Sequence, residues 1–330
     1  MIYTVTFNPA IDYVIHTDKV ELGSVNRVSK EAMFFGGKGI NVSAILKELD
    51  VKSVALGFVA GFTGEAIEKG VENMGIKTGF CHLKNGNSRI NVKLKEYNIK
   101  ENIKENIKEN IKDNSVCDDL ENERIGQETE INGQGPKIDN ESVEELLCKL
   151  DGLQDDDILI LAGSVPGSMP SNIYEIIIKR LSTKRIKIVV DATRDLLLKV
   201  LPYKPFLIKP NNFELGEIFN VNLDGKNVDE IFFYAKKLQD MGAKNVLVSM
   251  AGDGALLLDE NGDTHKCGVC KGVVKNSVGA GDSMVAGFVA GSLEGDYEYA
   301  LKLGTACGGA TAFAHGLGKK EEIYKLIKQL

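Results

Sequence analysis

The chain has 330 residues, of which 43% are hydrophobic and 26% are charged, and its formal net charge is −7. This composition is typical of a globular protein with a substantial core, and the length allows one large α/β domain or two smaller ones. Because no basic stripe runs along the sequence, nucleic acid and anionic membrane are disfavoured as main partners.

The N-terminal sequence "MIYTVTFNPAIDYVIH" predicts a strand rather than a signal peptide, because its first basic residue is Lys19. No stretch approaches the roughly 18 apolar residues that a membrane-spanning helix requires. The cysteines are scattered, and Cys267 and Cys270 form a C-x-x-C without a second ligand pair. We therefore expect a cytoplasmic protein with reduced thiols and no zinc site at these cysteines.

Strand-like and helix-like segments alternate along most of the chain. The patterns predict strands at 2–7, 53–59, 157–163, 186–192, 205–211 and 244–250, and helices at 40–49, 64–75, 142–150, 171–181 and 228–242. This alternation predicts a mainly parallel sheet with helices on both faces. Such sheets bind ligands beyond the carboxyl ends of their strands, so polar residues there are candidates for a site.

Residues 97–127 break the alternation with a four-residue repeat, "NIKENIKENIKENIKDN", that begins at Asn98. Such a low-complexity segment is typical of a solvated insertion that is partly helical or flexible. Strand-like sequences flank it at 89–96 and 128–133. The simplest interpretation is a hairpin whose tip has been expanded, because surface loops tolerate insertions at slight entropic cost.

The segment "NSVGAGDSMVAGF" (276–288) combines a small-residue loop, one carboxylate and a helix-like apolar stretch. Unpaired amides at a helix start attract phosphate, and Gly279 and Gly281 allow close approach of the backbone. A carboxylate there, Asp282, can accept the proton of an attacking hydroxyl as general base. The sequence alone leaves open the alternative that Asp282 only caps the helix.

Two common nucleotide-binding signatures are absent. The segment "GGKG" (36–39) is not a P-loop, because Ala32 stands where the first glycine belongs and Gly39 replaces Ser or Thr. No G-x-G-x-x-G occurs either, since Met284 ends the near-match that Gly279 and Gly281 begin. This disfavours a nicotinamide dehydrogenase, which is one rival class of function.

Several other residues suit a phosphotransferase. Asp12 follows the first strand and can accept sugar hydroxyls, while Lys38 and Asn41 lie in the glycine-rich turn "GGKGINVS" (36–43). Arg89 is a fork-shaped donor that suits a substrate phosphate. By sequence alone, Lys38 and Arg89 can equally be plain surface charges.

The segment "KPNNFE" supplies Lys209, Asn211 and Glu214 after a predicted strand. Asn211 and Glu214 are one helical turn apart, so they can hold a hydrated Mg²⁺ or simply start a helix. The glycine-bearing segment "SMAGDGA" (249–255) follows another strand, where a nucleotide can bind.

Taken together, three motifs make the chain resemble the ribokinase-like family of carbohydrate kinases. They are "NSVGAGDSMVAGFVAG" (276–291), "GGKGINVSAILKELDV" (36–51) and "NNFE" (211–214), and they occur in the order that the family has. The start "TVTFNPAIDYVI" and the segment "SRINVKLKE" resemble the branch that contains 1-phosphofructokinases and tagatose-6-phosphate kinases, with 1-phosphofructokinases the closer match.

The resemblance implies roles for named residues. It implies Asp282 as the catalytic base, with Gly279, Ala280 and Gly281 forming the anion hole. It implies a sugar-phosphate site made of Asp12, Gly36, Gly37, Lys38, Asn41, Arg89 and Ser164. It implies an ATP site made of Lys209, Asn211, Glu214, Ser249, Gly252 and Gly254, with Asn211 and Glu214 organising Mg²⁺ through water.

The resemblance also implies a fold and a reaction. We expect one ribokinase-like α/β domain over 1–330, with a small β lid from about 11–35 and 88–135 that pairs in a homodimer. The expected reaction transfers the γ-phosphoryl of Mg·ATP to fructose 1-phosphate, giving fructose 1,6-bisphosphate. Tagatose 6-phosphate and fructose 6-phosphate are the alternative substrates, and a non-catalytic sugar-phosphate sensor is the alternative class.

Overall fold

The structure is a computed structural model that describes residues 1–98, 125–192 and 194–330. Its centre is a ten-stranded sheet in the order β14 (Thr264–Cys267), β13 (Ala255–Leu258), β12 (Asn245–Ser249), β11 (Leu207–Ile208), β10 (Lys187–Asp191), β9 (Ile158–Ala162), β1 (Ile2–Thr6), β4 (Ser53–Ala60) and β5 (Lys77–Thr78), with β6 (Cys81–Leu83) paired to β4. All pairings from β12 to β6 are parallel, whereas β13 and β14 are added antiparallel at one edge. The predicted mainly parallel sheet is confirmed.

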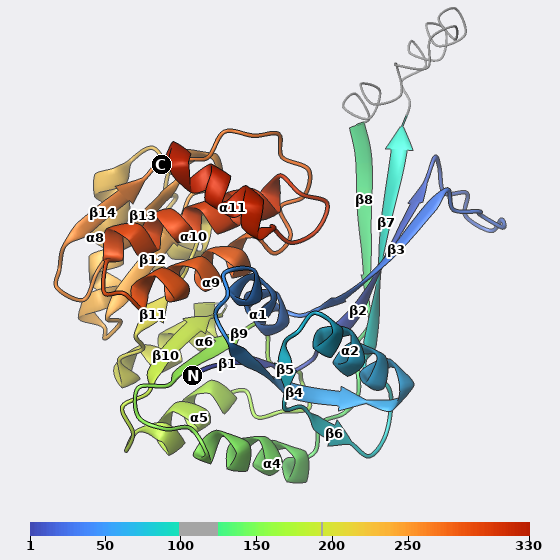
Figure 1. Ribbon diagram of the computed structural model, residues 1–330, viewed down its shortest axis with the longest axis horizontal. Coiled ribbons are helices and arrows are strands. Elements are labelled where there is room, and N and C mark those ends of the chain that lie inside the picture. The colour runs from blue at the N-terminus through green and yellow to red at the C-terminus, as the bar shows by residue number, and fades with distance from the viewer. Residues whose placement is uncertain (99–124, 193) are drawn as a thin grey trace, which may run out of the picture.

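Helices cover both faces of this sheet (Figure 1). One face packs against α4 (Asn140–Asp151), α5 (Ile173–Leu181), α6 (Arg194–Val200), α7 (Asn212–Phe219) and α8 (Val228–Asp240). The other face packs against α1 (Lys38–Glu48), α2 (Gly61–Asn73), α9 (Ala280–Ser292), α10 (Tyr297–Ala312) and α11 (Lys320–Leu326). Short 3₁₀ turns are η2 (Leu201–Tyr203), η3 (Ala251–Asp253) and η4 (Ile327–Gln329).

The core explains why the central strands are continuous apolar runs. In β9, Leu159 and Leu161 belong to the cluster on one face, while Ile158 and Ile160 belong to the cluster on the other. Successive side chains of a strand point to opposite faces, so a strand covered on both sides is apolar at every position. Each such buried side chain contributes about 1.5–3 kcal/mol of hydrophobic free energy.

A second sheet projects from the body of the molecule (Figure 1). Its four strands follow the order β3 (Lys30–Gly36), β2 (Ala10–Thr17), β7 (Arg89–Asn98) and β8 (Ile125–Asn132). β7 and β8 lie within the segment 88–135 predicted for a lid, and β2 and β3 extend one residue beyond each end of the segment 11–35, so we call this sheet the lid sheet. Because β7 and β8 pair antiparallel, the hairpin interpretation is confirmed. The strands extend into both ends of the predicted insertion 97–127, and its remainder, 99–124, lies outside the described residues.

The two faces of the lid sheet differ in chemistry. Register pairs Asp12 with Asn91 and Tyr13 with Val92, and adjacent residues of a strand alternate between faces. Asp12, Arg89, Asn91 and Lys93 therefore share one face, which we call the inner face because Arg89 lines a pocket with Lys38 of α1. The opposite, outer face carries Met33, Ile90 and Ile131 in its exposed part, together with the polar residues Glu31 and Glu96.

Within residues 1–98, 125–192 and 194–330, no helix is both long enough and apolar enough to cross a lipid bilayer.

Candidate active site

Asp282 is held in the first turn of α9 and points to α1 rather than along its own helix. The helix begins after Gly279, which has a φ of 82° and serves as the N-cap without a side-chain hydrogen bond. Asp282 is only 5% exposed, and its Oδ2 accepts a hydrogen bond of 2.9 Å from the Asn41 side-chain amide. The hypothesis that Asp282 only caps the helix is therefore wrong.

The loop before α9 brings backbone amides and a cation to the same place. The Ala280 amide, one of the three predicted for the anion hole, already donates to the Ser277 carbonyl at 3.2 Å. A β-carbon at Gly281 would lie 3.3 Å from the Lys209 ammonium, so the lysine reaches the helix start directly. A helix N-terminus beside an ammonium group favours a phosphate.

Lys38 and Lys209 converge on one buried carboxylate, Asp191, at the carboxyl end of β10. The Lys38 ammonium lies 2.9 Å from Asp191 and 3.9 Å from the Asp282 carboxylate, and Lys209 lies 3.4 Å from Asp191. Asp191 is 5% exposed and Lys209 is 7% exposed. Asp191 thereby fixes both lysines beside Asp282.

The two carboxylates have opposite pKa shifts. Burial, and next the negative charge of Asp191, raise the pKa of Asp282 to about 6 against the opposing effects of Lys38, Asn41 and Lys209. Burial also disfavours the ionised form of Asp191, but Lys209 and Lys38 outweigh it and hold its pKa below the ordinary value. Two neighbouring carboxylates whose pKa values are shifted in opposite directions are typical of a catalytic site.

Lys38 remains charged at the centre of this arrangement. Burial opposes its charged form, but the Asp191 and Asp282 carboxylates outweigh that effect and raise the pKa of Lys38. Its side chain is still 47% exposed, so the ammonium can also contact a ligand. The interpretation of Lys38 as a plain surface charge does not fit these contacts.

A pocket of about 190 Å³ adjoins this cluster and contains four of the predicted substrate residues. Those four are Gly37, Lys38, Arg89 and Ser164, and the remaining lining residues are Thr6, Phe7, Asn8, Ala162 and Gly163. The Arg89 Nε donates to the Asn8 carbonyl at 3.0 Å, which orients the guanidinium in the pocket wall. Burial lowers the pKa of Arg89, with Asp12 opposing that effect.

Asp12 lies beside the pocket on the inner face of the lid sheet. Its Oδ1 accepts a 2.8 Å hydrogen bond from Asn91, and its Oδ2 lies 3.6 Å from the Lys93 ammonium. A β-carbon at Gly36 would come within 2.9 Å of Asp12 Oδ2, so the absence of a side chain at Gly36 makes room for this carboxylate.

The residues predicted for ATP lie beyond β11 and β12. Asn211 and Glu214 form a reciprocal capping box at the start of α7, with both hydrogen bonds at 2.8 Å. An isolated parallel bridge joins Asn211 to Ser249, so these two positions are adjacent. Gly252 lies in the 3₁₀ turn η3, and Gly254 follows it with a φ of 94°.

The donor set decides what kind of metal site is feasible here. Among the described residues, no group of three or more His, Cys, Asp or Glu side chains is placed to hold a metal ion. Glu214 contributes one carboxylate, whose Oε2 accepts a hydrogen bond from the backbone amide of Asn211. These residues fit a Mg²⁺ that nucleotide phosphates and water hold, which is the usual arrangement for this ion.

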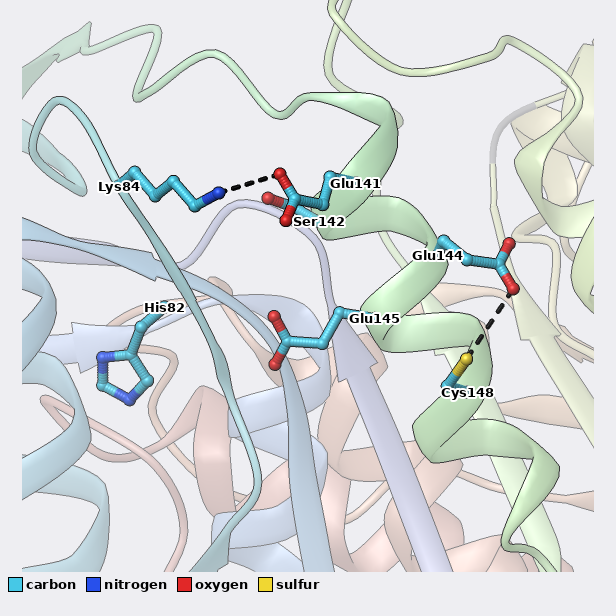
Figure 2. A pocket seen from close by; sticks show the side chains of 7 residues that line it. All are labelled: His82, Lys84, Glu141, Ser142, Glu144, Glu145 and Cys148. Carbon is cyan, nitrogen blue, oxygen red and sulfur yellow. Dashed lines mark hydrogen bonds and ion pairs between the residues drawn. The ribbon is translucent and has the colours of Figure 1, made fainter.

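A larger pocket of about 420 Å³ lies between β6 and α4, and its lining residues differ from every residue predicted for the site (Figure 2). It is lined by His82, Lys84, Glu141, Ser142, Glu144, Glu145 and Cys148. Lys84 is already paired with Glu141 at 2.8 Å, and both side chains are more than two-thirds exposed. We take the smaller pocket beside Asp282 as the candidate active site because the buried charges are there.

Asp191 and Asn91 join the site in the structure, although no sequence motif singles them out. Asp191 is the next-to-last residue of the predicted strand 186–192, and the available signal was that parallel sheets bind ligands beyond the carboxyl ends of their strands. Asn91 lies in the quoted segment "SRINVKLKE", two residues after Arg89, where strand periodicity places both on one face.

The fold and the site together define a phosphotransferase of the α/β class, with a buried carboxylate at a helix start and lysines around it. A model of the "pfkB family carbohydrate kinase" matches residues 5–126 and 106–323, and the chain belongs to this family. It is therefore a carbohydrate kinase with ATP as a substrate.

Known proteins agree with this assignment over the full length. The chain is 44% identical to the 1-phosphofructokinase of Bacillus subtilis (strain 168), covering all of this chain and 98% of that protein. It is 34% identical to the D-tagatose-1-phosphate kinase of Bacillus licheniformis, again covering all of this chain and 98% of the relative. Arabidopsis thaliana ribokinase, at 16% identity and a TM-score of 0.70 over 99% of this chain and 98% of that one, shares the fold. The expected ribokinase-like fold is confirmed.

Proposed function

We propose that this kinase transfers the γ-phosphoryl group of ATP to the 6-hydroxyl of fructose 1-phosphate, giving fructose 1,6-bisphosphate and ADP. The observation that carries the chemistry is the buried Asp282 carboxylate, which Asn41 orients at the start of α9 beside Lys38. The choice of sugar is supported by the 44% identity to a 1-phosphofructokinase.

Asp282 acts as general base in this proposal. The oxygen of the 6-hydroxyl forms a bond to the γ-phosphorus, the bond from that phosphorus to the bridging oxygen breaks, and the proton passes to Asp282. With a pKa of about 6, the carboxylate is mostly ionised at neutral pH yet basic enough to accept the proton. The helix start at Gly281 and the Lys209 ammonium next to it stabilise the charge that develops on the phosphoryl oxygens.

Arg89 and Lys38 are the candidates for the phosphate already present on the sugar. Both line the 190 Å³ pocket, and a guanidinium binds phosphate with two parallel hydrogen bonds. Asp12, on the inner face of the lid sheet, accepts hydroxyls of the sugar chain. Closing the lid sheet over this pocket excludes water from the transfer.

Glu214 and Asn211 are the residues that would hold Mg²⁺, through water, near the ATP phosphates. The ion would neutralise phosphate charge when it is bound. Ser249, Gly252 and Gly254 line the nucleotide in this proposal, because the bridge between Asn211 and Ser249 places β12 next to α7.

A second substrate, tagatose 1-phosphate, is favoured by one observation. A relative of 34% identity is a D-tagatose-1-phosphate kinase, and tagatose differs from fructose only in the configuration at C4. ATP consumption should be measured with fructose 1-phosphate, tagatose 1-phosphate, tagatose 6-phosphate and fructose 6-phosphate. We expect the largest kcat/KM with fructose 1-phosphate, and Asp282→Asn as the inactive control. No turnover with any of the four would favour the sugar-phosphate sensor instead.

We also propose a homodimer through the outer face of the lid sheet. On that face Ile131 is 64% exposed, Met33 is 53% exposed and Ile90 is 43% exposed. Contiguous exposed apolar side chains on a sheet mark an interaction surface, and a second copy presents the same surface for isologous pairing. Ile131→Lys should convert the dimer to a monomer in light-scattering measurements; a wild-type monomer would refute the dimer.

A further inference from the structure

We propose that Asn91 binds the sugar directly. Its Nδ2 holds Asp12 in place, while its Oδ1 accepts a hydrogen bond from a hydroxyl of the ketohexose chain. The inference rests on the proposed function, because it concerns the substrate of the same site. It adds a binding contact and a determinant of sugar specificity.

The side-chain oxygen of Asn91 is buried and unpaired. The residue is 6% exposed, and its Nδ2 donates to Asp12 Oδ1 at 2.8 Å. Its Oδ1 is buried without a hydrogen-bond partner, and it is the one such side-chain atom among the described residues. Leaving a buried acceptor unpaired costs about 1–3 kcal/mol, so a partner from outside the chain would recover that free energy.

Asn91 is two residues from Arg89, which lines the candidate pocket. Asn91 lies between Arg89 and Lys93 on β7, so all three side chains lie on the inner face of the lid sheet. Arg89 lines the candidate pocket, and Asp12 is the register partner of Asn91 on β2. A sugar phosphate that reaches Arg89 and Asp12 therefore passes alongside Asn91.

The cation next to Asp12, Lys93, has a second partner. The Lys93 ammonium lies 3.6 Å from Asp12 Oδ2 and equally 3.6 Å from the Glu130 carboxylate on β8. When sugar hydroxyls take the Asp12 carboxylate, Lys93 keeps its ion pair with Glu130. The hydroxyls can then approach Asp12 and the Asn91 oxygen without leaving a buried ammonium unpaired.

One acceptor fixed in this way distinguishes sugars by the direction of a hydroxyl. A site built to hydrogen-bond a substrate hydroxyl discriminates against analogues that lack it or present it differently. Fructose and tagatose differ at the C4 hydroxyl, and Asn91 contacts either this hydroxyl or the one at C3.

The test pairs a protein variant with altered substrates. Asn91→Leu keeps the size of the side chain and removes its hydrogen bonds, while Asn132→Leu changes the exposed register partner of Asn91 on β8 and is the matched control. KM and kcat are measured with fructose 1-phosphate, its 3-deoxy and 4-deoxy analogues, and tagatose 1-phosphate. Asn91→Ser serves as a second variant if Asn91→Leu does not fold.

We expect Asn91→Leu to raise KM for fructose 1-phosphate by about 10-fold or more, with KM for ATP unchanged. For the wild type, KM should be higher by a similar factor with one deoxy analogue than with fructose 1-phosphate. For Asn91→Leu, KM should be the same with that analogue as with fructose 1-phosphate. Equal losses with every sugar, or an unchanged KM, would overturn the inference while leaving the proposed function intact. If the wild type turns over none of these sugars, the proposed function fails and this inference with it.

Discussion

The ammonium of Lys38 lies 2.9 Å from the Asp191 carboxylate and only 3.9 Å from that of Asp282. One cation thus stands between two buried carboxylates, of which Asp191 has a second lysine partner and Asp282 does not. This asymmetry keeps Asp191 ionised and leaves Asp282 as the group that exchanges a proton near neutral pH.

The pH dependence of the rate should show this asymmetry. Because the base must be ionised, kcat/KM for the sugar should fall as pH decreases through about 6, the raised pKa of Asp282. In Asp191→Asn the acidic limb should move to lower pH, since the negative charge that raises this pKa is gone and Lys38 is free to pair with Asp282. Asp50→Asn, an exposed carboxylate paired with Lys320, is the control. An acidic limb that stays in place in Asp191→Asn would contradict this account.

Asp282→Asn should abolish most of the turnover without abolishing binding. Loss of a general base typically costs about 10²–10⁴-fold in rate. The amide keeps the shape of the side chain, so KM for ATP and for the sugar phosphate should change by less than about threefold. Steady-state kinetics with both substrates varied would check this, and a parallel loss of binding and rate would make Asp282 a structural residue.

The same variant should be more stable than the wild type at alkaline pH. The folded pKa of Asp282 is raised from 3.8 to about 6, so ionisation of this carboxylate opposes folding once pH exceeds the unfolded value. The penalty is on the order of 3 kcal/mol above pH 6 and is absent below about pH 4. Thermal unfolding should therefore show a higher Tm for Asp282→Asn at pH 8, with the difference shrinking by pH 5. A lower Tm at pH 8 would mean that attraction between the Asp282 carboxylate and the ammonium groups of Lys38 and Lys209 stabilises the fold by more than burial of the charge destabilises it.

Glu214→Gln separates helix capping from metal binding. The glutamine oxygen can still accept the Asn211 amide, so the capping box and the melting temperature should be nearly unchanged. The negative charge is lost, so the Mg²⁺ concentration for half-maximal rate should rise severalfold. Titration of the rate with Mg²⁺ at fixed ATP checks this; an unchanged midpoint would leave Glu214 with only its capping role.

Gly37→Ala should damage both stability and catalysis. Gly37 has a φ of 138°, and a β-carbon there would lie 2.4 Å from Thr6 Cγ2, so the first turn of α1 must shift. We expect a loss of about 2 kcal/mol or more and a lower kcat, because Lys38 moves with that turn. Gly268→Ala is the control, since a β-carbon at Gly268 meets no atom within 4 Å. Equal melting temperatures for the two variants would contradict the steric argument.

The sequence predicted the fold well because its signals are local. Strands such as Ile158–Ala162 are apolar at every position, and the helices between them have regular periodicity. The segments 36–51 and 276–291 are also recognisable locally, because each combines a glycine-rich turn with a helix-like stretch. The importance of Asp191 and Asn91, in contrast, comes from partners far away in the sequence: Lys38 is 153 residues from Asp191, and Asp12 is 79 residues from Asn91. Sequence patterns do not encode such pairings.

The glycine joint between β3 and α1 has a further consequence. The strand ends at Gly36 and the helix begins at Lys38, so a single residue, Gly37, separates a strand of the lid sheet from the lysine that faces both carboxylates. In the proposed closure, a tilt of the lid sheet over a sugar would move the N-terminal end of α1. Binding of the acceptor would then be mechanically coupled to the position of Lys38 beside the proposed base, and hydrolysis of ATP by water would be slow while the sugar is absent.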